Sequence, residues 1–411
     1  MLKQFKTDQL RVENIDVIFR RNLWWSNSGA IELPSDTNTV RDQKFIFSNI
    51  NISDPNPSNP PFNIQQGKGG VFSGTRFENV TIAAMPSAPN DKNILYAEAT
   101  GTIKDIAFHN LVIGGEVVTA NNWTTYFKTS KKEGTMSAGS VTDIRFTNSL
   151  LPRAGWKATG SGSGAAGNAI DDNNTTSRWT TNAAQTKTGQ YFQVDMRSNK
   201  TFDRVMLNTV TAKNEYPRGY TVLVSMNGTL WNSVATGSGA SAVTMITFPP
   251  QTARYIKVEQ TGRTGASSWS IYDFHVFESD ALNRAGWTAT GSSSSGLGNA
   301  MDGKLGTCWT TGAVQAVALQ QYFQVDMKSL KTFERISLDS VASPGDFPRG
   351  YEVFVSTDGV SWGSSIASGN GFIPVTSITF LPQTARYIRV NQTGSAPGNS
   401  WSIYEFNVYK R

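Results

Sequence analysis

Three acidic residues, Glu32, Asp36 and Asp42, lie close together near the start of the chain. A pair of carboxylates roughly 5 to 9.5 Å apart is what a glycosidase uses to cleave a glycosidic bond, one group acting as acid and the other as nucleophile or base. The preceding Trp24 and Trp25 could line a sugar subsite with their indole rings. We expect the three acids to share the loop that follows these tryptophans. The alternative, that they are solvated loop acids without a catalytic part, stays open.

A second set of residues has the chemistry for binding a sugar rather than cleaving it. Sugar binding requires an exposed aromatic face for the pyranose C–H groups and planar donors for pairs of hydroxyls. The candidates are Tyr216, Arg218 and Trp269, and later in the chain Phe347, Arg349 and Trp401. The alternative is that these residues belong to the core, with each arginine paired to Asp195 or Asp326.

The sequence contains few residues for other kinds of chemistry. The chain has one cysteine, Cys308, and two histidines, His109 and His275, so we expect no internal disulfide, no redox centre and no Cys/His zinc cluster. Its 37 Lys plus Arg against 31 Asp plus Glu give a net charge of +6, but the basic residues are scattered, which disfavours nucleic acid. No apolar run approaches the roughly 18 residues that a membrane span needs, and the first residues lack the apolar stretch of a signal peptide.

The candidate sugar-binding residues lie in two repeats. Five strings occur twice, 131 or 132 residues apart: RAGW, YFQVDM, PRGY, QTARYI and WSIY. We therefore predict two homologous domains, residues 150–279 and 280–411. Alternating β-branched and aromatic residues separated by Gly/Ser loops predict that each domain is an antiparallel sandwich or jelly roll.

The first 149 residues follow another pattern, in which an apolar residue is followed two positions later by Asn. This pair recurs at Val12/Asn14, Phe47/Asn49, Phe77/Asn79, Phe108/Asn110 and Phe146/Asn148. One apolar rung and one stacked Asn per coil predict a partial right-handed parallel β-helix, with His109 facing outward beside the Asn stack. The chain would thus be all-β, and we expect the five coils to be the C-terminal part of a longer helix. An ordinary sandwich with chance matches is the alternative.

The repeated strings carry a family resemblance. NAID before Trp179, NAMDG before TCW, and then YFQVDM, PRGY, ARYI and the final WSIYEF resemble the coagulation factor 5/8 C-type, or discoidin, domain. The repeats are most similar to the family 32 carbohydrate-binding modules, which have a galactose-binding-like jelly-roll fold. The front segment resembles the last coils of pectinase- and dextranase-like glycoside hydrolases.

The resemblance implies a structural calcium site in each repeat, because such modules bind Ca²⁺ with carboxylate, hydroxyl and carbonyl oxygens. The residues that match the family pattern are Asp171, Ser177 and Asp273 in the first repeat, and Asp302, Thr307 and Glu405 in the second. In the first repeat Asp172 replaces Gly303, and the loop to Trp179 is one residue longer. The galactose-binding His of the family has no evident counterpart, since we expect His275 in the last strand.

Our leading expectation is a secreted bacterial, extracellular protein that binds a polysaccharide or glycan, as the C-terminal targeting region of a polysaccharide-degrading glycoside hydrolase. Two tethered modules would gain avidity by linkage. The alternatives are a complete β-helix hydrolase acting on a polymer such as an α-glucan, and a non-enzymatic discoidin-type adhesin. The sequence leaves the sugar specificity and the oligomeric state open.

Overall fold

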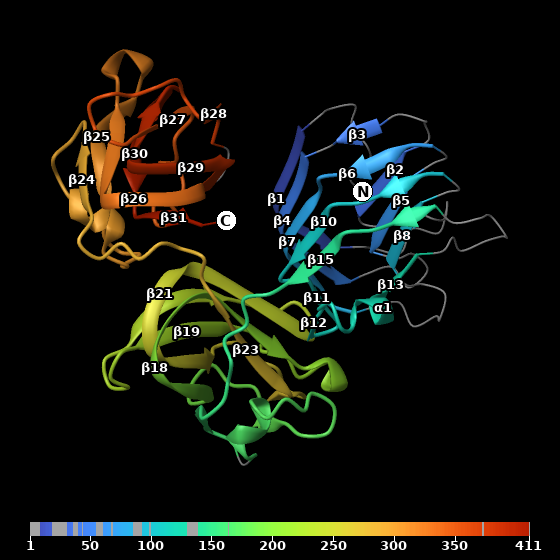
Figure 1. Cartoon of the computed structure of the whole chain (residues 1–411). Helices are drawn as coiled ribbons and strands as arrows, with labels where there is room; N and C mark the ends of the chain where they lie inside the picture. Colours follow the sequence, from blue (N-terminus) through green and yellow to red (C-terminus); the bar gives the residue numbers. More distant parts are fainter. Residues whose placement is uncertain are drawn as a thin grey trace. The chain divides into compact units, whose positions relative to one another are not determined.

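The computed structural model in Figure 1 describes residues 9–18, 31–35, 40–42, 44–54, 61–66, 69–84, 93–97, 100–129, 139–162, 164–371 and 374–410. The chain forms two compact units. The first comprises residues 1–200, 204–247 and 253–278, and the second comprises residues 201–203, 248–252 and 279–411.

Residues 9–147 build three parallel sheets, which the chain visits in turn. The first contains β1 (Gln9–Ile18), β4 (Lys44–Asp54), β7 (Arg76–Ile82), β10 (Ile106–His109) and β15 (Ile144–Thr147), in this order. The second contains β2 (Ile31–Ser35), β5 (Phe62–Gln66), β8 (Asn93–Ala97) and β13 (Phe127–Lys128), and the third β3 (Val40–Asp42), β6 (Val71–Ser73), β9 (Thr102–Ile103) and β14 (Ser140–Val141). Each circuit of the chain therefore adds one strand to each sheet.

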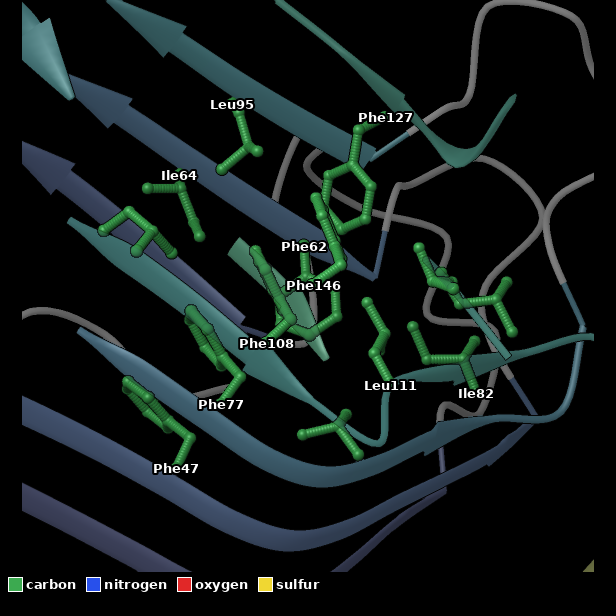
Figure 2. Close-up of a cluster of buried hydrophobic side chains, with 14 of the residues drawn as sticks. Phe47, Phe62, Ile64, Phe77, Ile82, Leu95, Phe108, Leu111, Phe127 and Phe146 are labelled. Atoms are coloured by element: carbon green, nitrogen blue, oxygen red, sulfur yellow. The ribbon is translucent and has the colours of Figure 1, made fainter. Parts of the chain in front are cut away.

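A ladder of phenylalanines fills the space enclosed by these sheets (Figure 2). Phe47, Phe77, Phe108 and Phe146 are register partners on neighbouring strands, and their rings stack with centroids 5.0, 4.9 and 4.9 Å apart. Parallel in-register strands place identical side chains directly above one another, which makes this stacking possible. The predicted aromatic rung is confirmed at these four positions.

The predicted Asn stack is confirmed where the described side chains test it. Asn79 and Asn110 both have positive φ, at 57° and 54°, a conformation that Asn tolerates better than most residues. The Asn110 amide donates to Asn79 Oδ1 at 3.1 Å and accepts from the Ser149 backbone N–H at 2.8 Å. His109 is half-buried on the opposite face of β10 from Phe108, with its Nδ1 2.9 Å from Thr147 Oγ1, which agrees with the predicted outward orientation.

A short hairpin follows β10. Its strands are β11 (Val112–Ile113), which also pairs with β7, and β12 (Glu116–Val117), and the four-residue helix α1 (Trp123–Tyr126) comes after it. The turn residues Gly114 and Gly115 have φ of 61° and 83°, as a two-residue hairpin turn requires. In the part of the chain that the structure describes, no helix is long and apolar enough to cross a membrane.

Each repeat folds as an antiparallel sandwich of one six-stranded and one two-stranded sheet, as predicted. The first contains β16 (Lys157–Gly160), β18 (Tyr191–Asn208), β21 (Val243–Gln260), β19 (Tyr220–Ser225), β20 (Asn232–Gly237) and β23 (Asp273–Glu278), facing β17 (Trp179–Ala184) and β22 (Ser268–Ile271). The second contains β24 (Thr288–Gly291), β26 (Tyr322–Asp339), β29 (Val375–Gln392), β27 (Tyr351–Ser356), β28 (Ala367–Gly369) and β31 (Glu405–Tyr409), facing β25 (Trp309–Gln315) and β30 (Ala396–Ile403).

Among the described residues of the repeats, four 3-10 turns complete the fold: η1 (Ala166–Ala169), η2 (Val210–Ala212), η3 (Leu297–Met301) and η4 (Val317–Leu319). The turns η1 and η3 come just before Asp171 and Asp302, two of the predicted calcium ligands.

Candidate functional site

The loop before β19 in the first sandwich, and its counterpart before β27 in the second, carry an arginine lying over an aromatic ring. The Arg218 guanidinium carbon is 3.8 Å from the centre of the Tyr216 ring, and Arg349 is also 3.8 Å from the centre of the Phe347 ring. All four side chains are half-buried. Each arginine donates to a carbonyl of its own loop at 2.8 Å, which leaves further N–H donors of the guanidinium for a ligand.

A buried glutamine fixes each of these loops. In the first sandwich, Gln185 donates to the Tyr216 carbonyl at 2.9 Å and to the Ser268 carbonyl at 3.0 Å, and accepts from the Arg218 backbone N–H at 2.9 Å. The Gln260 amide also donates to Gln185 at 2.6 Å. A side chain with four satisfied hydrogen bonds holds the loop in one conformation.

Gln315 repeats this arrangement in the second sandwich. It donates to the carbonyls of Phe347 and Ser400 at 2.9 Å and accepts from the Arg349 N–H at 3.0 Å. Sequence reasoning missed both glutamines. The available signal was that an Ala-X-Gln string ends β25 and recurs just after β17, between the repeated motifs.

The alternative pairing of these arginines with acids of the long strands is wrong. Asp195 accepts instead from Arg254 at 2.8 and 2.9 Å, and this arginine holds the pKa of Asp195 down at about 2. Asp326 makes the equivalent pair with Arg386, which lowers its pKa below the usual range.

The prediction that Trp269 and Trp401 expose an indole face is also wrong. Both side chains are completely buried, and their rings meet those of Trp179 and Trp309 edge to face with centroids 4.9 and 5.1 Å apart. They lie on β22 and β30, and the large apolar rings fill the space between the two sheets of each sandwich. The stacking candidates are thus reduced to the half-buried Tyr216 and Phe347.

The surroundings of the two arginine loops differ. In the first sandwich Arg178 lies 3.4 Å from the Glu215 carboxylate and donates to the Tyr272 hydroxyl at 2.8 Å. The second sandwich has Cys308 at the position of Arg178, whereas Asp346 corresponds to Glu215 and accepts from the Ser402 hydroxyl as Glu215 accepts from the Ser270 hydroxyl. The exposed Val314 and Val317 lie on either side of the buried Gln315. The two loops therefore share a frame but present different polar groups.

The predicted calcium ligands of the second repeat come together. The Thr307 hydroxyl donates to Asp302 Oδ2 at 2.8 Å, and the Lys304 N–H donates to Asp302 Oδ1 at 2.9 Å. Glu405 is completely buried, and its Oε1 has no hydrogen-bond partner among the described residues, while its other oxygen accepts from Arg284. Burial, together with the negative charge of Asp302, raises the pKa of Glu405 to about 7 despite the nearby Arg284. An orphaned buried carboxylate oxygen beside a second carboxylate fits a hard dication.

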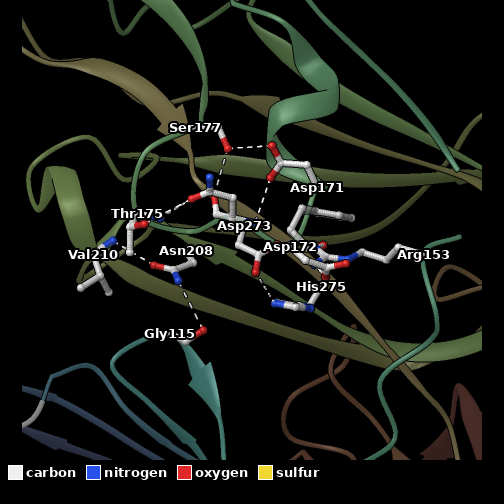
Figure 3. Close-up of polar contacts among 12 residues, drawn as sticks. Gly115, Arg153, Asp171, Asp172, Thr175, Ser177, Asn208, Val210, Asp273 and His275 are labelled. Atoms are coloured by element: carbon white, nitrogen blue, oxygen red, sulfur yellow. Dashed lines mark hydrogen bonds and ion pairs between the residues drawn. The ribbon is translucent and has the colours of Figure 1, made fainter.

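The first repeat fits a metal ion less well (Figure 3). The Ser177 hydroxyl donates to Asp171 at 2.7 Å, as in the second repeat. Asp273, however, has both carboxylate oxygens engaged, one by Arg153 and the other by His275 Nε2 at 2.7 Å, and Asp172 also binds Arg153. The prediction that Asp273 is available as a metal ligand is therefore not supported. Among the described residues, no group of three or more His, Cys, Asp or Glu side chains is placed to hold a metal ion.

The three candidate catalytic acids do not share one loop, contrary to the prediction. Glu32 lies in β2 and Asp42 in β3, strands that belong to two different parallel sheets. The β-branched and aliphatic neighbours of these acids favour strands, which the loop interpretation overlooked. Asp36 lies outside the described residues, as do Trp24 and Trp25.

Residues 155–274 and 287–406 each match the family model of the F5/8 type C domain. A galactose oxidase of Gibberella zeae is 30% identical over 165 residues, which cover 37% of this chain and 24% of that protein. The match thus spans about a quarter of the length of this curated relative.

Two solved structures of bacterial modules are also similar. The tandem CBM32-1 and CBM32-2 domains of Clostridium perfringens ZmpB are 14% identical with a TM-score of 0.28, covering 64% of this chain and 94% of that chain. The family 32 module of C. perfringens NanJ in complex with galactose is 24% identical with a TM-score of 0.29, covering 32% and 98%.

Proposed function

Because the chain belongs to the F5/8 type C domain family through residues 155–274 and 287–406, we propose that it binds carbohydrate through the arginine loop of each sandwich. The observation that carries this proposal is the repeated geometry of Arg218 over Tyr216 and of Arg349 over Phe347. A guanidinium held over an aromatic ring offers donors for paired hydroxyls close to an apolar surface for C–H groups. The ligand class is a polysaccharide or glycan, met outside the cell.

Each sandwich would bind weakly by itself, since one loop contacts only part of a sugar chain. Two binding loops on one chain raise the overall affinity, because the second binding event takes place at a high effective concentration. The different surroundings of the two loops favour different sugars for the two modules, because Arg178 lies beside Glu215 in one and its position is Cys308 in the other.

Replacing Arg218 and Arg349 together by alanine is expected to abolish retention on the polysaccharides that the wild-type chain binds. Each single replacement should weaken binding about 10-fold, the effect of losing hydrogen bonds to a charged donor. Insoluble-polysaccharide pull-downs and a glycan array measure this effect. Lys213→Ala is the control, because this exposed lysine lies in the same loop as Arg218 and has the same charge. Full retention by the double variant contradicts the proposal.

We further propose that residues 1–149 are coils of a parallel β-helix from a polysaccharide-degrading hydrolase. Three parallel sheets that receive one strand per circuit, and the stacked Phe and Asn ladders, support this assignment. Reducing-sugar release by the whole chain would indicate a working catalytic site, and its loss in Glu32→Gln or Asp42→Asn would identify the acids. Binding without release would indicate a targeting role.

We propose that the second sandwich holds a structural Ca²⁺ ion through Asp302, Thr307 and Glu405. Removal of calcium is expected to destabilise this sandwich by about 2 to 3 kcal/mol, the value for an ion at 100 times its Kd. Thermal unfolding monitored by hydrogen exchange measures this loss of stability in each sandwich separately. Glu405→Gln should remove the sensitivity to chelator, whereas Asp171→Asn in the first sandwich should leave it unchanged. Identical melting of the second sandwich with calcium and with chelator contradicts the proposal.

A further inference from the structure

The first sandwich has an apolar patch on the outside of its large sheet. Met206 on β18, Val243 on β21 and Phe277 on β23 are 0 to 2% exposed, and they cluster separately from the residues between the two sheets of that sandwich. The outer face of an antiparallel sheet ordinarily faces water and carries polar residues. Something in the chain therefore covers this patch.

The covering element is the β11–β12 hairpin, whose apolar residues point to two sides. Leu111 and Ile113 pack in the core of the three parallel sheets, whereas Val112 and Val117 pack against the patch of the first sandwich. Alternate residues of a strand point to opposite faces, so a hairpin with apolar residues at consecutive positions joins two cores. Val112 is 0% and Val117 8% exposed.

Two polar contacts accompany this apolar contact, and Figure 3 shows the one between Asn208 and Gly115. Asn208 on β18 donates to the Gly115 carbonyl at 3.3 Å, and Arg204 on the same strand donates to Asn79 in the Asn stack. The hairpin turn approaches so closely that a Cβ built on Gly115 would lie 2.2 Å from Asn208 Nδ2. A Cβ on the neighbouring Gly114 would meet nothing within 4 Å.

The second sandwich shows that the patch is not a requirement of the fold. By alignment of the repeated strings, Met206, Met245 and Phe277 correspond to Ser337, Ser377 and Tyr409. There the Ser337 hydroxyl lies 3.1 Å from the Tyr409 hydroxyl, so the same positions carry a polar pair. The first repeat is apolar where the hairpin contacts it.

We propose that the β11–β12 hairpin and the outer face of β18, β21 and β23 form a docking interface, which makes the three parallel sheets and the first sandwich one cooperative unit. The five apolar residues of this interface are Val112, Val117, Met206, Val243 and Phe277. Their burial depends on both parts being folded, so neither part should open without exposing its side of the patch. This inference is independent of any ligand of the arginine loops.

The interface is tested on the full chain by exchanging one glycine of the hairpin turn for alanine. Gly115→Ala should separate the unfolding of the three parallel sheets from that of the first sandwich, because its methyl group displaces Asn208. Hydrogen exchange of the amides from Arg204 to Asn208 should rise roughly 10-fold or more. Gly114→Ala is the matched control, since Gly114 also has a positive φ in the same turn but no neighbour within 4 Å. Equal behaviour of the two variants overturns the proposal.

A second variant approaches the interface from the sandwich. Met206→Ser with Met245→Ser introduces the residues that the second repeat has at these positions, so the sandwich itself should still fold. Calorimetry of the full chain is expected to resolve separate transitions for the three parallel sheets and for the first sandwich, in place of one common transition. A single transition at the wild-type temperature would overturn the proposal, because it would show that the patch adds nothing to the coupling.

Discussion

Replacing Phe108 by alanine is expected to destabilise the three parallel sheets by about 3 to 5 kcal/mol, the range for deleting a buried phenylalanine. The Phe108 ring is 1% exposed and stacks at 4.9 Å on Phe77 on one side and at 4.9 Å on Phe146 on the other. Phe62 and Phe127 also contact it, at 5.7 and 5.3 Å. Removing this ring would interrupt the ladder and leave a cavity between two circuits of the chain.

Denaturant unfolding followed by hydrogen exchange measures this loss of stability in the front segment. Phe108→Leu is the control, because it keeps most of the apolar volume and should cost clearly less than alanine. A loss of stability below about 1 kcal/mol for Phe108→Ala would contradict the packing described above, because only the removal of a ring outside the core costs so little.

Gln315→Leu is expected to destabilise the second sandwich by about 3 to 5 kcal/mol and to weaken its glycan binding. Leucine would leave the carbonyls of Phe347 and Ser400, the N–H of Arg349 and the amide of Gln392 without their partner. Each buried group left unsatisfied costs about 1 to 3 kcal/mol. The loop would then sample other conformations, so Arg349 would no longer be held over its ring.

Thermal unfolding and polysaccharide pull-down measure the two effects on the same protein sample. Gln321→Leu is a matched control, because Gln321 is also buried but donates a single side-chain hydrogen bond, to the Val314 carbonyl at 3.0 Å. It should cost less stability and leave glycan binding unchanged. If the two variants lose binding equally, Gln315 does not position the arginine loop.

Periodic features of this protein could be predicted from the sequence, because they follow from local geometry. The spacing of Phe77 and Phe108 predicts one rung per circuit, and in-register pairing places their rings in contact. The repeated strings likewise predict two sandwiches, since two segments with similar sequences adopt the same fold. Both predictions depend only on residues repeating, not on where the chain folds back.

The candidate site could be predicted only in part, because burial is decided by distant segments. Trp269 and Arg218 both lie where a loop meets a strand, yet Trp269 is completely buried and Arg218 only half-buried. Gln185 and Gln315 belong to a residue type that is usually exposed. Their role in fixing the arginine loops appears only in the folded structure, where the segments that they join lie together. The residues predicted as calcium ligands in the first repeat match a family pattern, but Arg153 and His275 bind Asp273 from positions that the pattern does not include.

The apolar outer face of the first sandwich has a practical consequence for anyone who divides this chain. A fragment that begins near residue 150 would expose Met206, Val243 and Phe277 to solvent, and such an exposed hydrophobic patch favours aggregation during expression. Low yield of such a fragment would therefore say little about its capacity to recognise a sugar. Replacing Met206 and Met245 by the serines of the second repeat would restore solubility without changing the arginine loop. The first sandwich could then be produced and studied as a separate domain.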